Sequence, residues 1–427
     1  MDESEFAGMI KDAGGRLYIA GGWVRDRIRG AAPHDKDYVV AGLAEDTFRS
    51  LSGARRIGAS FPVYRAEIGG ELCDVALARG ERKTGLGYRG FEAASSPHTT
   101  IEEDLERRDT TMNSIALDVE TGEIIDPFGG VADIGNRIIR AASSRFADDP
   151  VRALRAARQA AQFDFSIERA TIGMMGSLRG EIMGEPGERI AGELKRAMSC
   201  GRPSIFFRAL LDAGILDAVY PQVYALKGLP HLPEHHPEGD AFEHSMRVLD
   251  DVARMTGRAE VRFAALAHDL GKALTPIDER PHYYGHERLG LDALSEWNRL
   301  MTLPRRWTLC AKFAIEEHMR AWSITRPGKI VDLLNRLRGH PIGPDGFSAI
   351  VLADSGALPE FLENFQGYCE VLDRVTRSAA PPGMEGAALG EWIRRRRIDE
   401  YRMFAPPGET SRPNRFQSTH RRYTGRS

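Results

Sequence analysis

The chain has 427 residues, 42% hydrophobic and 28% charged, and a formal net charge of −3. One core rarely serves more than about 250–300 residues, so several cores are expected. No apolar run approaches the roughly 18 residues that cross a membrane, and the acidic start MDESEFAG is unlike a secretory signal. The four cysteines form no C-x-x-C pair, which disfavours a disulfide framework or a zinc ribbon. These features predict a protein of the reducing cytoplasm without membrane contact.

Arginine dominates the basic residues. Lysine and arginine together number 58, but only eight are lysine, so fifty are arginine. From Leu389 to Ser427 ten arginines face four acidic residues, a balance of +6, so residues 1–388 carry −3 − 6 = −9. The planar guanidinium suits phosphate groups and base edges. The arginines after Leu389 therefore have two interpretations, contact with a nucleic acid or a solvated basic tail.

In chain order, the first 140 residues alternate short strand-like runs with glycine turns, which predicts an α+β or α/β domain. Strands are expected at residues 17–20, 38–41, 72–77, 115–119 and 123–125, and helices at residues 22–29 and 101–113. Helical periodicity begins near Asp148 and continues to about residue 375.

Two breaks rich in proline and glycine, at residues 228–240 and 379–386, indicate domain junctions. A basic helix is expected at Leu389–Arg402, and the residues from Ala405 lack periodicity and are expected to be disordered. We therefore predict four parts, comprising residues 1–140, 141–228, 229–378 and 379–427.

The first candidate site follows the first strand. Gly21-Gly22 leads into a helix, and such a turn presents backbone N–H groups to an anion, with Arg25 one turn into the helix. Asp35 and Asp37 alternate on the next expected strand, where a period of two places both carboxylates on one face. Paired carboxylates are hard ligands that hold Mg²⁺. This pairing indicates nucleotidyl transfer, with Gly22 and Arg25 binding the nucleotide and the two aspartates catalysing.

Two further charged motifs carry a family resemblance. Residues 107–114 read R-R-D-T-T-M-N-S, and residues 148–152 read D-D-P-V-R. With the glycine turn and the paired aspartates, they resemble the bacterial class II nucleotidyltransferases, which comprise tRNA CCA-adding enzymes and poly(A) polymerases. The resemblance implies two Mg²⁺ ions at Asp35 and Asp37 and a triphosphate contact from Arg108.

The second motif is expected to read the nucleobase. Asp149 and Arg152, three residues apart on an expected helix, would lie on one face and offer an acceptor and a bidentate donor to base edges. The resemblance assigns the choice of C or A to Asp149 and Arg152, with Arg155 one turn on. The alternative for Arg152, Arg155 and Arg158 is a solvated helix face. Residues 81–90 match the flexible loop of the family.

Two more acids have two interpretations each. Asp74 lies in an expected strand and is either a third metal-binding carboxylate or an ordinary strand-end acid. Asp109 is either a further carboxylate of the site or a structural partner for an arginine.

A second candidate site lies in the helical part of the chain. His244, His268-Asp269 and Asp354 form the pattern H…HD…D, each on an expected helix, so that their side chains could converge on one metal ion. The run H-D-L-G-K would be costly to bury in an apolar helix without a metal or a partner. The pattern resembles the HD phosphohydrolase superfamily and implies a divalent ion such as Ni²⁺, Mg²⁺ or Mn²⁺.

The remaining histidines are less clearly assigned. His286 and His318 are candidates for an enlarged or second metal site, and the alternative is a surface or satisfied core histidine. His231, His235 and His236 lie in the proline-rich junction and are expected to be loop residues.

The order of the two sites resembles the CCA-adding enzymes that carry a C-terminal HD domain. Residues 58–63 and 77–83 also look like the CCA-adding form. The resemblance implies an α+β fold, with a polymerase-beta-like head and mixed sheet followed by an all-α neck and HD domain. It implies addition of C-C-A to the tRNA acceptor end from CTP and ATP, with phosphatase, 2′-nucleotidase and 2′,3′-cyclic phosphodiesterase activity, in a monomer or homodimer.

Three alternatives remain open. A poly(A) polymerase would share every catalytic residue, and an alarmone synthetase–hydrolase joins the same two chemistries but with the hydrolase first. A tRNA-binding protein whose sites have decayed is the alternative from another class.

We predict that the affinity for tRNA falls steeply with salt, by at least about 10-fold between low and high salt, because arginines release counterions from the phosphates. Filter binding over a salt series measures this slope. An affinity that stays flat over the series would contradict the prediction.

Overall fold

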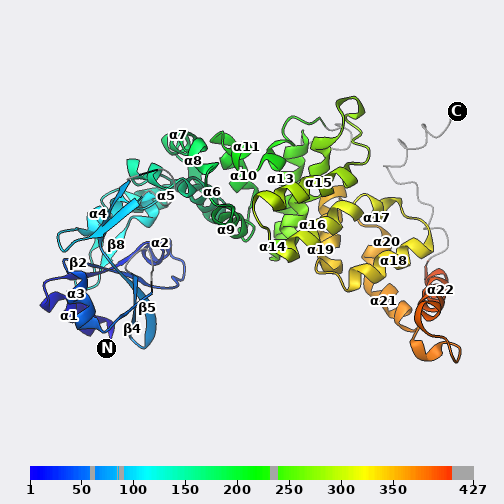
Figure 1. Cartoon of the computed structure of the whole chain (residues 1–427), viewed down its shortest axis with the longest axis horizontal. Coiled ribbons are helices and arrows are strands. Elements are labelled where there is room, and N and C mark those ends of the chain that lie inside the picture. Colours follow the sequence, from blue (N-terminus) through cyan, green and yellow to red (C-terminus); the bar gives the residue numbers. More distant parts are fainter. Residues whose placement is uncertain (58–62, 84, 86–90, 231–238, 406–427) are drawn as a thin grey trace. The chain divides into compact units, whose positions relative to one another are not determined.

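The computed structural model describes residues 1–57, 63–83, 85, 91–230 and 239–405. The chain divides into two compact units, Met1–Pro221 and Gln222–Ser427 (Figure 1). Most of the motif at residues 58–63, much of the loop at 81–90, the three junction histidines and the tail from residue 406 lie outside the described residues. The four-part division of the chain stays a prediction.

The first unit contains a mixed sheet in the order β3-β4-β5-β2-β1-β8-β9. Its strands are β1 (Arg16–Ala20), β2 (Asp37–Ala41), β3 (Arg55–Arg56), β4 (Val63–Ile68), β5 (Glu71–Leu77), β8 (Ala116–Asp118) and β9 (Ile124–Ile125). Only β2 and β5 pair in parallel among these strands, and β6 (Arg79–Lys83) and β7 (Phe91–Ser95) form a separate antiparallel pair. The expected strands of this region are therefore confirmed.

Helices surround this sheet and continue beyond it. They are α1 (Glu3–Asp12), α2 (Gly22–Ile28), α3 (Glu45–Ser52), α4 (Ile101–Glu106), α5 (Gly130–Asn136), α6 (Val151–Phe163), α7 (Arg169–Ser177), α8 (Arg179–Ile182), α9 (Gly187–Ala197), α10 (Ser204–Asp212), α11 (Leu216–Val219) and α12 (Pro221–Tyr224). One face of the sheet packs Tyr18 and Val39 against Ile101 and Leu105 of α4. This packing places α4, and the charged residues that follow it, beside the centre of the sheet.

The expected helix over residues 101–113 is wrong in its second half. Helix α4 ends at Glu106, and only a short 3-10 helix, η1 (Thr111–Asn113), follows. The break arises at Thr110, whose backbone is extended and forms a bridge with Ala141. A residue paired in this way cannot take part in the hydrogen-bond ladder of a helix.

The regular elements of the second unit are helices, with no strand among its described residues. Its helices are α13 (Ala241–Met255), α14 (Ala259–Ala267), α15 (His286–Leu300), α16 (Arg305–Glu317), α17 (Arg320–Ser323), α18 (Pro327–Arg338), α19 (Gly343–Ser355), α20 (Glu360–Glu363), α21 (Phe365–Asp373) and α22 (Gly386–Phe404). Phe263 lies at the centre of this unit, with its ring 5.1 Å from those of both Trp297 and Trp307. The α+β head and the mostly helical remainder are therefore as expected, except that the neck contains the strand β11 (Ser166–Ile167), which pairs in parallel with β10 (Ile138–Ile139).

The basic helix α22 is held to α18 by two of its arginines. Arg394 donates to both carboxylate oxygens of Asp332 at 2.8 Å, and Arg397 donates to the side-chain oxygen of Asn335 at 2.8 Å. Part of the arginine excess after Leu389 therefore serves helix packing. Across the described part of the chain, no helix combines the length and the apolar character that a membrane span requires.

The turn between β1 and α2 supplies a test with a matched control. Gly21 has φ +80°, and a Cβ there would lie 2.8 Å from Nη1 of Arg108, whereas a Cβ at Gly22 would lie 3.6 Å from Nη2 of Arg25. We predict that Gly21→Ala costs about 1–3 kcal/mol of local stability and displaces Arg108. Gly22→Ala, at a helix start, should change stability by less than about 1 kcal/mol.

Hydrogen exchange of peptides from β1 and β2 measures both variants. Equal protection in Gly21→Ala and Gly22→Ala would contradict the proposed strain at Gly21.

Candidate functional site

A cleft of about 390 Å³ lies in the first unit, where the turn after β1 meets the start of β2 and the segment after α4. Its lining is rich in charged and amide side chains and comprises Gly21, Gly22, Arg25, Asp37, Arg107, Arg108, Asp109, Asn113, Arg152 and Arg155. Of the residues expected at the first site, Asp35, Asp74 and Asp149 are not among those that line the cleft.

The glycine turn places Arg25 at this cleft. Gly21 donates its N–H to the carbonyl oxygen of Ile115 at 3.0 Å, which fixes the turn against the strand β8 region. Arg25 donates to the side-chain oxygen of Asn113 at 2.8 Å and to both carboxylate oxygens of Asp26. The guanidinium is therefore held at the cleft by partners on either side.

A fully buried carboxylate holds the two arginines that follow α4. Asp104 is 0% exposed and accepts hydrogen bonds from Arg107 and from Arg108, the latter at 3.0 Å. Burial alone would raise the pKa of Asp104, but the two guanidiniums keep it below its ordinary value. Asp104 is thus ionised, and it orients both guanidiniums at the edge of the cleft.

The two aspartates that were expected to be catalytic are placed differently from the expectation. β2 begins at Asp37, and Asp35 lies in the preceding loop with φ +21°, so the prediction that both residues alternate on one strand is wrong. The reason is pairing, because β1 turns away at Gly21 and the ladder between β2 and β5 begins with Asp37 opposite Asp74. Register, rather than alternation along one strand, brings a second carboxylate beside Asp37.

The charges around Asp37 suit a cation. The pKa of Asp37 is raised by its removal from water and further by the carboxylates of Asp74 and Asp35, while Arg108 opposes the shift. Asp74 also pairs with Arg65 of β4 at 3.0 Å. Carboxylates that repel one another in this way are relieved by a divalent cation, for which their oxygens are preferred ligands. The residues present therefore fit a divalent cation.

The carboxylate of Asp109 accepts hydrogen bonds from two segments of the first unit. Its carboxylate accepts from the side chain of Asn113 at 3.0 Å, from the backbone of Thr110 at 2.8 Å and from Gln159 of α6 at 3.0 Å. Burial would raise the pKa of Asp109, but the charges of Arg155 and Arg152 and the hydrogen bonds from Asn113 and Thr110 lower it. Asp109 therefore ties the segment after α4 to α6, and it lines the same cleft.

The residues expected to read the nucleobase separate into two groups. Asp149 precedes α6 instead of lying on it, so the prediction that it shares a helix face with Arg152 is wrong. Pro150 occupies the N-cap position of α6, and the Asp149 carboxylate accepts from Arg189 of α9 at 2.8 Å and 3.1 Å. A residue before proline is disfavoured in the helical region, which explains this boundary.

The arginines of α6 are not a solvated face. Arg152 is 7% exposed and lines the cleft, as does Arg155. Arg158 does not line the cleft and instead donates to Glu193 of α9 at 2.7 Å. Two of the three arginines therefore face the same space as Asp37.

A second cluster lies in the second unit. His244 lies on α13 and Asp354 on α19, whereas His268 and Asp269 follow the last residue of α14. His286 is the first residue of α15, and His318 follows the end of α16. The expectation that each ligand lies within a helix is therefore wrong for His268 and Asp269, because the chain turns there into a 3-10 helix, η3 (Leu270–Leu274).

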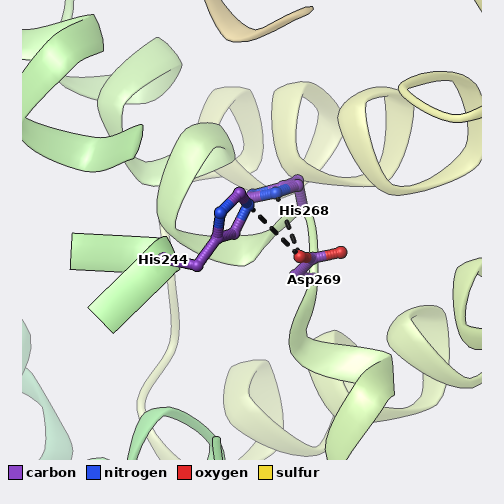
Figure 2. A group of neighbouring side chains, drawn as sticks. All are labelled: His244, His268 and Asp269. Carbon is purple, nitrogen blue, oxygen red and sulfur yellow. Dashed lines mark ion pairs between the residues drawn. The ribbon is translucent and has the colours of Figure 1, made fainter. Parts of the chain in front are cut away.

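Asp269 stands between two groups of imidazoles. Its Oδ2 lies 3.3 Å from Nε2 of His268 and 3.6 Å from Nε2 of His244, and Figure 2 shows these side chains turned toward one another. Its Oδ1 lies 3.4 Å from Nε2 of His286 and 3.5 Å from Nε2 of His318. Each group has the spacing to hold one metal ion, with Asp269 common to both.

Asp354 lies next to His244 and His268 of the first group. Its Oδ1 lies 3.0 Å from Nε2 of His244 and 3.6 Å from Nε2 of His268. Burial would lower the pKa of His268, but the carboxylates of Asp269 and Asp354 raise it to about 10. Burial likewise would raise the pKa of Asp269, yet His268 and Lys272 hold it well below its ordinary range.

The ring orientations prepare three of the histidines to bind a metal ion. Nδ1 of His268, His286 and His318 donates to a backbone carbonyl at 2.7 Å, 2.9 Å and 2.9 Å. Because a carbonyl only accepts, each Nδ1 carries a proton, and Nε2 is the nitrogen that would bind a metal ion. In His268 the ion would displace a second proton, which the two carboxylates hold at Nε2. Among the described residues, the buried Nε2 of His268 forms no hydrogen bond of good geometry, which fits a metal ion there. Oδ2 of Asp269 forms an ion pair with Lys272 at 2.5 Å.

His244 is oriented differently. Arg247, which only donates, lies 3.3 Å from Nδ1 of His244, so Nδ1 accepts and, without a metal ion, Nε2 carries the proton that faces Asp354. A metal ion bound at Nε2 would displace that proton. Nearby, a Cβ at Gly271 would lie 1.9 Å from the carbonyl oxygen of His286. The glycine of H-D-L-G-K therefore permits the close approach that brings η3 and α15 together.

Sequence reasoning missed two residues of the first site, Asp104 and Gln159. Both are buried and neither was expected to contribute. A signal for Asp104 existed, because Ile101, Asp104 and Leu105 share one helical face, and an acid on an apolar face requires a cationic partner.

Comparison with protein families assigns three segments. The model described as the Poly A polymerase head domain matches residues 17–140, and the HD domain model matches residues 241–342. A model described as the probable RNA and SrmB-binding site of polymerase A matches residues 164–226.

Solved structures share the fold. One titled as the apo form I of a CCA-adding enzyme aligns with a TM-score of 0.63 at 20% identity, covering 95% of this chain and 90% of that chain. A Bacillus stearothermophilus CCA-adding enzyme in complex with CTP aligns with a TM-score of 0.60 at 22% identity, covering 93% and 90%.

Sequence relatives are closer. The multifunctional CCA protein of Nitrosococcus oceani is 36% identical over 397 residues, covering 90% of this chain and 97% of the relative. That of Methylococcus capsulatus is 38% identical over 402 residues, covering 90% and 93%, and that of Mannheimia succiniciproducens is 41% identical over 335 residues, covering 75% and 79%. With the head and HD domain models matched in the same order, the chain belongs to the multifunctional CCA protein family.

Proposed function

We propose that this protein adds C-C-A to the 3′ end of tRNA from CTP and ATP, and that its HD domain hydrolyses phosphate esters. The observation that carries the proposal is the cleft in which Asp37 shares one space with Arg25, Arg108, Arg152 and Arg155. A carboxylate for cations, arginines for a triphosphate and arginines for a base are the groups that untemplated nucleotidyl transfer needs.

Positioning and charge neutralisation do most of the work at the first site. Arg108, oriented by Asp104, and Arg25, held by Asn113, bind the triphosphate beside the glycine turn, with Gly22 starting the helix. Asp37 and Asp35 hold the cations, and Asp74, as the register partner of Asp37, is a third candidate. Two Mg²⁺ ions, when bound, would activate the tRNA 3′-hydroxyl and neutralise the departing pyrophosphate.

The choice of nucleotide is assigned to the start of α6. Arg152 and Arg155 line the cleft and can donate to base edges. Asp149 accepts the base amino group in this proposal, with Arg189 positioning its carboxylate. Asp109 is assigned a positioning role, through Asn113 and Gln159.

The HD domain is proposed to act on phosphomonoesters or 2′,3′-cyclic phosphates. His244, His268, Asp269 and Asp354 hold one divalent ion, and Asp269, His286 and His318 hold a second. Ni²⁺, Mg²⁺ and Mn²⁺ are the candidate ions, and a bound ion supplies a nucleophilic water and neutralises the phosphate charge. Within this arrangement Arg247 orients His244.

The alternatives are less well supported. The relatives are named multifunctional CCA proteins, and the HD domain follows the head, which is unlike both a poly(A) polymerase and an alarmone synthetase–hydrolase. Product length separates CCA addition from poly(A) tailing, since only the first stops after three nucleotides. The protein is proposed to act in the cytoplasm, which its four free cysteines suit, as a monomer or a homodimer.

We predict that Asp37→Ala or Asp35→Ala reduces CMP and AMP incorporation into a trimmed tRNA by at least about 100-fold, because the cations lose a ligand. Asp46→Ala, which removes an exposed acid from α3 of the same unit, is the matched control and should keep full incorporation. Sequencing of the extended tRNA measures both the rate and the product. Full incorporation by either aspartate variant would refute the assignment.

We predict that His268→Ala or Asp269→Ala lowers the rate of 2′,3′-cyclic AMP hydrolysis by at least about 100-fold. CCA addition should stay intact, since the histidine cluster and the transferase cleft lie in different units. His282→Ala, an exposed histidine of the same unit, serves as the control. Metal content of the purified variants should fall in parallel. Loss of both activities in a folded variant would argue against independent sites.

A further inference from the structure

A second basic cavity lies in the second unit, formed by residues that belong to neither candidate site. Its volume is about 610 Å³, and its lining includes Arg258, Arg305, Arg306 and Arg338, with Leu309 and His340 between them. These residues come from the starts of α14 and α16 and from the end of α18 and the loop after it. Three separate elements therefore contribute guanidinium groups to one hollow.

Nearby acids neutralise only part of this charge. Glu260 lies 3.2 Å from Nε of Arg258 and 2.9 Å from Nε of Arg306, and Asp373 lies 2.6 Å from Arg338. These two carboxylates thus face three of the four guanidiniums. The Arg305 guanidinium has no hydrogen-bond or ion-pair partner within the described ranges, although it lines the cavity. The hollow consequently keeps an excess of positive charge.

The helix starts at the cavity add to this excess. α16 begins after Pro304 without a side-chain cap, and its first turn carries Arg305 and Arg306 but no acid. Arg258 occupies the N-cap of α14, where its guanidinium pairs with Glu260 of the first turn and its side chain forms no cap bond to a backbone N–H. The N-terminus of a helix is its positive end, so arginines there are unfavourable unless an anion is present. The local sequence and the cavity therefore point to the same ligand chemistry, a phosphate group.

We propose that this cavity binds phosphates of the tRNA backbone, at a place distinct from the 3′ end in the transferase cleft. The proposal rests on the proposed function, which supplies tRNA as the polyanion. Exposure favours an RNA chain over a single phosphate, because the Arg306 side chain is 61% exposed and Arg305 is exposed as well. Exposed guanidiniums on long stems follow a chain of phosphates, while the apolar edge of Leu309 suits a ribose face.

Arg305→Ala tests the proposal, because this side chain has no structural partner to lose. With full-length protein and a tRNA that lacks its 3′ end, we expect the Kd to rise on the order of 5-fold and the salt slope to fall by about 0.7–0.9. Arg305→Lys, which keeps the charge, should recover most of the affinity. An unchanged Kd and slope in Arg305→Ala would overturn the proposal.

Arg299→Ala is the matched control, since Arg299 is an exposed arginine of α15 in the same unit and pairs only with Glu296 of its own helix among the residues described. Its tRNA affinity should equal that of the wild type, and an equal loss in both variants would overturn a specific site. Titration with inorganic phosphate at constant ionic strength separates the two sources of phosphate. Phosphate binding that Arg305→Ala abolishes, with tRNA affinity unchanged, would refute an RNA site in favour of a free anion.

The proposed function is tested separately. If the wild-type protein binds trimmed tRNA with the Arg305 dependence described but incorporates no nucleotide, the proposed function fails while the RNA site stands. If the wild-type protein incorporates nucleotides but Arg305→Ala leaves the tRNA affinity unchanged, the proposed function stands and the RNA site fails.

Discussion

Both candidate sites depend on a carboxylate that is removed from water and matched with positive charge. A buried carboxylate without a partner is far too costly to persist, so its partners are fixed as strictly as it is. In the first unit Asp104 is fully buried and holds Arg107 and Arg108. In the second unit Asp269 is 1% exposed and holds imidazoles on both of its oxygens. The positions of the reactive groups follow from this demand.

The buried charges of Asp104 and Asp269 are neutralised by different kinds of partner. Asp104 is neutralised by arginines, which stay protonated, so its site is a permanent scaffold that turns guanidiniums toward the cleft. Asp269 is surrounded by histidines, whose protons can leave when a metal ion binds. The first arrangement suits binding of a triphosphate, and the second suits a metal centre. One electrostatic rule therefore produces two chemically distinct sites in one chain.

The distribution of arginine follows the same logic. Some arginines are structural, as Arg158 is with Glu193 and Arg394 with Asp332. Others face open space at the cleft, as Arg152 and Arg155 do. Net charge therefore says little about a nucleic-acid partner, because structural arginines are cancelled by the acids they pair with. What matters is which arginines line a cavity.

The sequence by itself determined the two sites, their order and the class of fold, because local motifs such as Gly21-Gly22 and His268-Asp269 depend on short-range geometry. The α+β head and the helical remainder followed from periodicity, and the comparisons bear out the family that the motifs suggested. The roles of the individual residues in the two sites stay predictions. Asp104 and Gln159 escaped notice because their importance lies in burial against partners that periodicity does not reveal.

Only the tertiary structure decided which residues of each motif meet. Strand register places Asp74 beside Asp37, and a proline boundary turns Asp149 toward Arg189 instead of onto a helix face with Arg152. The cavity at Arg258, Arg305 and Arg338 likewise joins segments far apart in the chain. Sequence spacing specifies neighbours along one element, whereas contacts between elements depend on register and packing of the whole unit.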